Sequence, residues 1–269
     1  MNRKNTSIML LVAVAMLAIL GAGCQKLRAR DQLNKGVQAF RNGSYPAAVE
    51  NFKVAVSLDP QFPTARLYLA MAYMMQYIPG AESPENSRMS QAAHDEFMKV
   101  LEQDPKNSLA LAYLAKLFFD QKKLTEAAEW NRKLIDADPK NKEAYYTLGV
   151  IAWTQTFQPR MEARAKLGMR PEDTGLLKDK KVRAELASKS LPIIEDGLQN
   201  LEKALVIDPE YDDAMAYMNL LYRERADLQD TEAAYKKDTE TADDWIDKTL
   251  KTKKAKAARM PSGGISAEQ

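Results

Sequence analysis

The chain has 269 residues, 45% of them hydrophobic and 28% charged, a composition typical of a water-soluble fold. The formal charge of +2 comes from Arg3 and Lys4, and residues 24–269 hold 37 cations against 37 anions, a balance that gives no reason to expect nucleic acid as a partner. One cysteine and one histidine exclude an internal disulfide and a zinc site of the usual histidine and cysteine type.

Residues 1–23 have the pattern of an export signal. A positive start precedes an apolar run, Ile8–Leu20, and three small residues then lead to Cys24. This ending resembles the lipobox of bacterial lipoproteins, although the family prefers leucine at the position of Gly21. We therefore expect a lipoprotein signal peptide at 1–23, lipid on Cys24 and a short linker at 24–28. The alternatives are that Cys24 is an ordinary small hydrophobe or that the signal remains as an uncleaved anchor.

Location follows from the same resemblance. Gln25 after the lipidated cysteine, in place of aspartate, implies sorting to the outer membrane in lipoproteins of two-membraned bacteria. We expect a domain in the cell envelope, anchored by lipid and facing the periplasm. The longest uncharged run after the signal, residues 67–81, is shorter than the roughly 20 apolar residues that a membrane helix needs.

A repeat follows the signal. Four Asp-Pro pairs each end an apolar helical stretch, with prolines at Pro60, Pro105, Pro139 and Pro209. Their separations of 45, 34 and 70 residues predict a 34-residue unit with insertions of 11 and 36 residues. Small residues recur in the first predicted helix of each unit (Gly36, Ala70, Ala115, Gly149) and in the second (Ala48, Ala93, Ala127, Gly197).

This period and these small residues resemble the tetratricopeptide repeat. The resemblance implies an all-α fold, a right-handed α-solenoid of about five helical pairs, with a 36-residue helical insertion in the fourth unit and a long C-terminal helix. The solenoid is predicted over 29–247, with units at 29–62, 63–107, 108–141, 142–211 and 212–247.

The irregular parts have their own predictions. Ser83 and Pro84 are expected to start the second helix of the second unit, so that its extra residues form a short loop and added helical turns. The insertion at 156–189 predicts two short helices around a turn at Gly168-Met169-Arg170-Pro171. Residues 248–269, basic and then containing glycine and serine, are expected to form a disordered tail.

The resemblance also implies a binding groove along the concave side, which the first helices line. The family's groove positions correspond here to Val37, Phe40, Arg41, Leu67, Met71, Met74, Met75, Lys116, Phe119, Tyr146, Val150 and Trp153. Methionines and aromatic residues at these positions predict a groove that binds a peptide or helix of a protein partner. The alternative is that these residues are core, covered by the insertion or by the C-terminal helix.

The sequence therefore predicts a membrane-anchored, non-catalytic adaptor of the cell envelope, without cofactor, metal or nucleic acid. The alternatives are a self-associating architectural protein, which would be a homo-oligomer, and a wall-glycan hydrolase using carboxylates such as Asp173, Asp179 or Glu185. His94 and the acids Asp208, Glu210, Asp212 and Asp213 are interpreted as structural, because neither has the spacing of a metal site.

Overall fold

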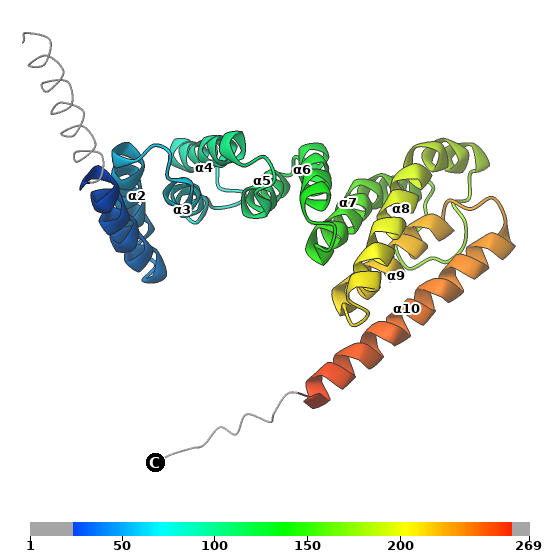
Figure 1. Ribbon diagram of the computed structural model, residues 1–269. Coiled ribbons are helices and arrows are strands. Elements are labelled where there is room, and N and C mark those ends of the chain that lie inside the picture. Colours follow the sequence, from blue (N-terminus) through cyan, green and yellow to red (C-terminus); the bar gives the residue numbers. More distant parts are fainter. Residues whose placement is uncertain (1–23, 260–269) are drawn as a thin grey trace, which may run out of the picture. The chain divides into compact units, whose positions relative to one another are not determined.

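The protein is described by a computed structural model covering residues 24–259, and every regular element in that range is a helix. The predicted all-α repeat fold is confirmed, with helices that follow one another in five pairs (Figure 1). They are residues 24–41 with α2 (Tyr45–Leu58), α3 (Pro63–Met74) with α4 (Pro84–Gln103), α5 (Ser108–Asp120) with α6 (Leu124–Ala137), α7 (Lys142–Lys166) with α8 (Lys180–Ile207), and α9 (Asp212–Ala226) with α10 (Glu232–Arg259). None of the helices in the described range is long and apolar enough to cross a membrane.

The chain divides into two compact units at a boundary inside α6. Within the described range, the N-terminal unit comprises residues 24–127 and the C-terminal unit residues 128–259. Residues 1–23, which hold the predicted signal, and residues 260–269 lie outside the described range. Each unit has a core of its own, so the two are described separately.

Turn residues end the first helices of the N-terminal unit. Gly43 has the predicted left-handed conformation, with φ at 72°. Lys122, at the same point of the third pair, also has a positive φ, 59°, and the amide of Lys123 donates to the carbonyl of Phe118 at 2.9 Å. A left-handed lysine is strained relative to glycine, but this bond satisfies a carbonyl at the end of α5. Ser44 occupies the N-cap position of α2 without the predicted side-chain hydrogen bond.

The predicted small-residue positions of the N-terminal unit are buried, as Ala48, Ala70 and Ala93 show at 0% exposure. Phe52 and Leu69 pack beside Ala48, and the ring of Tyr68 stacks on Phe52 with 5.5 Å between centroids. The residues before Ala29 differ from the prediction, because 24–28 are helical and not a linker. These five residues include no glycine or proline, and glutamine, lysine, leucine and arginine all favour helix.

In the C-terminal unit the fourth pair absorbs the long insertion into its own helices. The prediction of two separate short helices is wrong, since α7 runs unbroken for 25 residues and α8 for 28. Each helix continues through an internal proline, Pro159 in α7 and Pro192 in α8. Residues 167–179 connect them and contain the predicted turn, with Gly168 at a φ of 65°.

A buried ionic network fastens this extension to α9. Arg160 donates to both carboxylate oxygens of Glu224 at 2.6 and 2.9 Å and to Asp227 at 2.7 Å. Arg164, almost fully buried, also donates to Asp227 at 2.7 Å and to the carbonyl oxygens of Arg170 and Asp173 in the connection. Burial opposes the charge of Arg160, but its bonds to Glu224 and Asp227 raise its pKa above the ordinary value.

The last helix is longer than predicted. Residues 248–259, expected to belong to a disordered tail, form the end of α10. Their cations pair with acids at the start of α9: Lys256 with Asp212, and Arg259 with Glu210 at 2.8 Å. Thr249 is also buried against the unit. The sequence prediction missed these ion pairs because the acids that bind the basic residues lie more than 40 residues earlier in the chain.

Small residues allow α7 and α8 to cross closely. A Cβ added to Gly197 would lie 2.5 Å from the Cβ of Ala152 and 2.8 Å from a methyl carbon of Leu221. The Cβ of Ala152 is bonded directly to the backbone and cannot rotate away. Alanine at Gly197 would therefore push the two helices apart.

We predict that Gly197→Ala destabilises the protein by about 1–3 kcal/mol through overpacking, although alanine is favoured over glycine within a helix by about 1 kcal/mol. Urea denaturation followed by circular dichroism measures the change. The double variant with Ala152→Gly should regain part of the loss, because it removes the Cβ that alanine would strike. A Gly197→Ala protein as stable as the parent would contradict the close crossing.

Candidate protein-binding surface

Nine of the predicted groove residues lie on the first helices of the N-terminal unit, which are residues 24–41, α3 with its C-cap Met75, and α5; the side they line is called the first-helix surface. Val37 and Phe40 are partly buried and pack against the core, and the Phe40 ring lies 5.3 Å from Tyr45. Arg41 is exposed. Lys116 is exposed and forms an ion pair with Asp120 at 2.8 Å, and Phe119 beside it is partly buried. Part of this surface therefore packs against the core and is not free to bind a partner.

The predicted groove residues of α3 are also partly in the core and partly on the surface. Met74 is 6% exposed and belongs to the core, so it differs from the surface residue that the groove prediction implies. Met75, at the end of α3, is 47% exposed, while Leu67 and Met71 are partly buried. Met75 is thus the predicted groove methionine that a partner can reach most easily.

In the C-terminal unit the three remaining groove residues lie among aromatic rings. Tyr146 lies 5.1 Å from Tyr211 and 5.5 Å from Tyr217, and Trp153 lies 5.8 Å from Tyr217. Burial and the neighbouring Tyr217 raise the pKa of Tyr146 to about 12. Val150, on the same helix, is partly buried. Tyr146 and Trp153 thus connect α7 to the start of α9 and to α9 itself, and all three groove residues are partly exposed.

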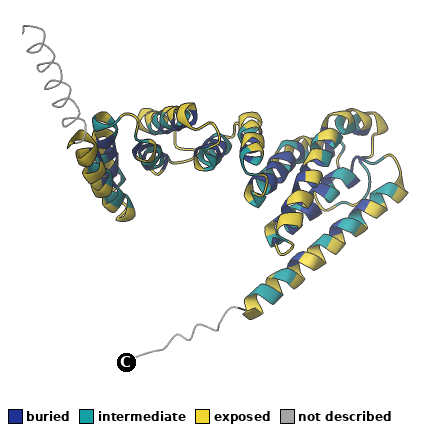
Figure 2. Ribbon diagram, in the orientation of Figure 1, coloured by how far each residue is buried: buried dark blue, intermediate teal, exposed yellow. Residues whose placement is uncertain are grey.

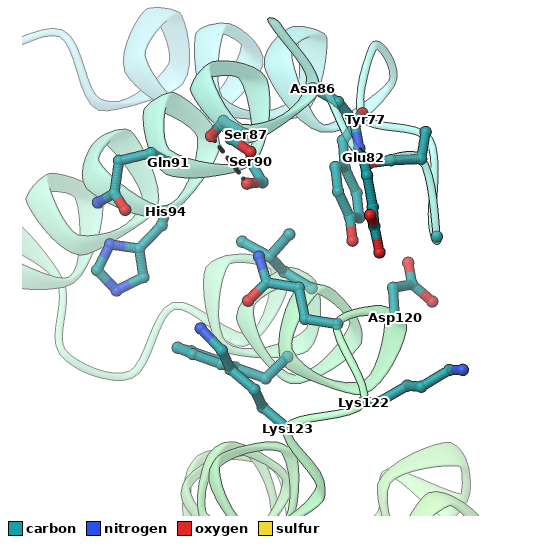
Figure 3. Close-up of a pocket in the computed structure, with 15 residues that line it drawn as sticks. Tyr77, Glu82, Asn86, Ser87, Ser90, Gln91, His94, Asp120, Lys122 and Lys123 are labelled. Atoms are coloured by element: carbon teal, nitrogen blue, oxygen red, sulfur yellow. Dashed lines mark hydrogen bonds between the residues drawn. The ribbon is translucent and has the colours of Figure 1, made fainter. Parts of the chain in front are cut away.

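A pocket of about 670 Å³ lies in the N-terminal unit, where the eleven-residue insertion interrupts the repeat. Its wall consists of residues 77–82 after α3, the first half of α4, and the end of α5 with its following turn (Figure 3). The sequence predicted the insertion and the start of α4 at Pro84 correctly, and the Ser83 hydroxyl accepts the Asn86 amide at 3.1 Å. It did not predict a pocket.

Asn86 holds the pocket loop in place. Its side chain accepts the amide of Ile78 at 2.7 Å and donates to the carbonyl oxygens of Ile78 and Ala81 at 2.8 and 2.7 Å. Asn86 itself is buried, whereas Ile78 and Ala81 are exposed residues of the loop. One side chain therefore replaces the hydrogen bonds that the loop lacks as secondary structure. An asparagine three residues after an N-cap serine was the sequence signal that could have indicated this anchor.

The pocket has polar ends of different charge. Tyr77, Glu82 and Asp120 lie at one end and Gln91 and His94 at the other (Figure 3). Burial and the charge of Asp120 raise the pKa of Tyr77.

The end at His94 is tied to its own helix. The His94 Nδ1 donates to Asp95 at 3.0 Å, and this bond lowers the pKa of the Asp95 carboxyl. Lys122 and Lys123 border the pocket at the turn after α5. Such a mixed lining suits a polar peptide segment better than a purely apolar ligand.

The acids proposed for a hydrolase have structural partners. Asp173 accepts the backbone amide of Arg170 at 2.8 Å, and this bond lowers the pKa of its carboxyl. Asp179 caps α8 by accepting two backbone amides at 2.9 Å. Glu185 pairs with Lys189 at 3.0 Å on an exposed face. The structure gives each of the three a local role.

Three of the four acids around the start of α9 also pair with cations. Asp208 accepts Lys142 at 2.6 Å, and this bond lowers the pKa of its carboxyl. Asp212 and Glu210 pair with the end of α10, while Asp213 is exposed. Cys24, the predicted lipidation site, is exposed at the start of the described range.

Successive helix pairs crossing at small residues define a helical repeat protein. The tetratricopeptide repeat family model matches residues 33–77 and 86–142. The predicted repeat is confirmed over these residues, which include most of the N-terminal unit and the pocket lining apart from Gly80, Ala81 and Glu82.

Two kinds of relatives agree with this result. The mitochondrial import receptor subunit TOM70 of Rattus norvegicus is 28% identical over 160 residues, covering 59% of this chain and 24% of the receptor, so the chain spans about a quarter of that relative. A crystal structure of MamA has a TM-score of 0.58 at 15% identity, covering 87% of this chain and 97% of MamA. YrrB, described as a TPR protein with an unusual peptide-binding site, has a TM-score of 0.53 at 14% identity, covering 85% and 91%. The solved structures show the same fold.

We predict that Asn86→Ala loosens the pocket loop and costs about 1–3 kcal/mol, because three backbone groups lose their hydrogen-bond partner. Hydrogen exchange followed by mass spectrometry should show faster exchange at residues 76–83, with the helices still protected. Ser87→Ala is the matched control, since Ser87 is the next residue and is exposed. Equal exchange in both variants would show that Asn86 is not the anchor.

Proposed function

We propose that this chain is a non-catalytic adaptor of the bacterial cell envelope, held at a membrane by lipid on Cys24. Its first-helix surface binds a peptide or helix of a protein partner. The observation that carries the proposal is the exposure of Met75, close in sequence to a pocket that the inserted residues help to line. Met75 is two residues before Tyr77, which lines the pocket, so an apolar contact and polar groups are available together.

The chemistry of this surface suits a peptide. Methionine adapts to apolar side chains of different shape, and the polar ends of the pocket can fix the direction of a bound chain. The peptide-binding site named for YrrB supports the same use of the fold. Since the other apolar residues of the first-helix surface are partly or fully buried, we expect a short segment to be recognised and not a broad surface.

The envelope assignment depends on the N-terminus. The sequence of residues 1–23 supports export, and the exposure of Cys24 supports acylation because the sulfur lies free of the core. By this proposal the outer membrane holds the protein and the repeats face the periplasm. The hydrolase alternative has no observation in its favour, because Asp173, Asp179 and Glu185 all have structural partners.

Met75→Glu should remove the partner, since it places a charge in the apolar contact. Crosslinking in intact cells followed by co-purification measures this, and the captured partner should fall by about tenfold or more, as expected for a loss above 1.4 kcal/mol. Val54→Glu on the second helix α2 is the matched control, because Val54 is 43% exposed and Met75 is 47% exposed. An unchanged set of partners in Met75→Glu would place the interface elsewhere.

Cys24→Ala should release the protein from the membrane. Fractionation of cells together with labelling by a radioactive or clickable fatty acid tests the anchor, and both the label and the membrane-bound fraction should be lost in the variant. Labelling that persists without Cys24, or no labelling of the parent protein, would refute the anchor. Neither result would affect the partner test at Met75.

A further inference from the structure

The charges of α10 are separated along its length. Between Asp238 and Asp247 the helix holds five acids and no base, and between Lys248 and Arg259 it holds six bases and no acid. Such a helix has one negative half and one positive half. Two copies laid antiparallel would bring opposite charges together along their whole contact.

The side of α10 that faces α9 has already used its charges. Asp238 is buried and accepts Arg225 at 2.6 and 3.0 Å. Lys256 and Arg259 pair with acids at the start of α9. These groups are therefore part of the unit's own fold and are not available to a partner.

The outer side of α10 has charged residues that form no ion pair with α9. Asp244, Asp247, Lys251 and Lys254 are exposed, and within residues 24–259 none of them forms an ion pair. The exposed residues along this helix are visible in Figure 2. The outer side thus keeps the same division into an acidic and a basic half.

Two apolar residues lie at the edge of this outer side, next to α9, where these halves meet. Ile246 is 37% exposed and Leu250, one turn later, is 61% exposed. With Ala216 and Leu220 of α9 they line an apolar hollow of about 200 Å³. Asn219 and Thr249, which also line it, each donate a hydrogen bond to a backbone carbonyl at 2.7 Å. The remaining lining residues are apolar, so the hollow can take an aliphatic side chain.

We propose that this outer side of α10 binds the same side of a second copy of the chain. The two helices would lie antiparallel about a two-fold axis near Leu250, with Leu250 of each copy against the hollow of the other. Asp244 and Asp247 of one copy would then lie opposite or within a turn of Lys254 and Lys251 of its partner. A self-complementary surface of this kind closes on itself as a dimer.

The size and charge of the surface determine the strength of this contact. A hollow larger than the roughly 150 Å³ cavity that can bind benzene accommodates a leucine side chain. One helix face, however, buries less area than a permanent dimer. The dimer is therefore weak and dependent on salt, and it does not require the first-helix surface or the lipid.

Thiol crosslinking of the full chain tests the geometry. In a Cys24→Ala background, Leu250→Cys should form a disulfide-linked dimer on mild oxidation, because the two positions meet near the axis. Val206→Cys on α8 is the control, since Val206 is exposed and lies outside this surface. Equal dimer formation at both positions, or capture of a different protein at position 250, would overturn the proposal.

Charge exchange tests the orientation. Adding Lys251→Glu and Lys254→Glu to the Leu250→Cys chain should reduce the dimer by about tenfold, and so should adding Asp244→Lys and Asp247→Lys, because like charges then face each other. Mixing the two variants should restore the dimer between them. Circular dichroism confirms that both variants are helical, and failure of the mixture to crosslink would refute antiparallel pairing.

Discussion

The close approach of paired helix backbones is the constraint on which the rest of this structure depends. At Gly197 the space for a single methyl group is already occupied by Ala152 of the facing helix. Ala48 and Phe52 are buried at the corresponding crossing of the first pair, where Gly36 leaves room for the Phe52 ring. Because small residues fix the separation within a pair, the residues between crossings are free to vary in number. Insertions of 11 and 36 residues can therefore enlarge a helix pair, and the enlarged pair still packs on the pair that follows it.

The two insertions are stabilised by different means. The short one is held by a neutral side chain, Asn86, which binds three backbone groups of its loop. The long one is held by charged side chains, with Arg160 and Arg164 bound to Glu224 and Asp227. A buried charge without its partner is strongly unfavourable, so this network defines one arrangement of the connection and excludes others. The loop held by Asn86 borders a pocket, whereas the connection held by the arginines is packed against its own unit.

Local sequence signals were sufficient for much of the fold. Asp-Pro pairs marked the ends of second helices, and Gly43 and Ser83 marked a turn and a helix start, because each acts through its own backbone. Signals that depend on distant partners were missed. The end of α10 is held by acids more than 40 residues earlier in the chain, as in the bond between Lys256 and Asp212. Of the groove residues, Met74 turned out to be buried and Met75 exposed, since a periodic pattern gives a face of a helix but not what covers it.

The ionic network also has a consequence for the order of folding. In the N-terminal unit a typical long-range ion pair, Arg66 with Glu96, joins residues 30 apart, whereas Arg160 and Glu224 are 64 apart. Longer loops lose more chain entropy on closure, and folds rich in distant contacts form more slowly. We therefore expect the helix pairs of the N-terminal unit to assemble early and the contacts of Arg160 and Arg164 to form late. Until they form, the extended ends of α7 and α8 are the part of the chain most open to a chaperone or a protease.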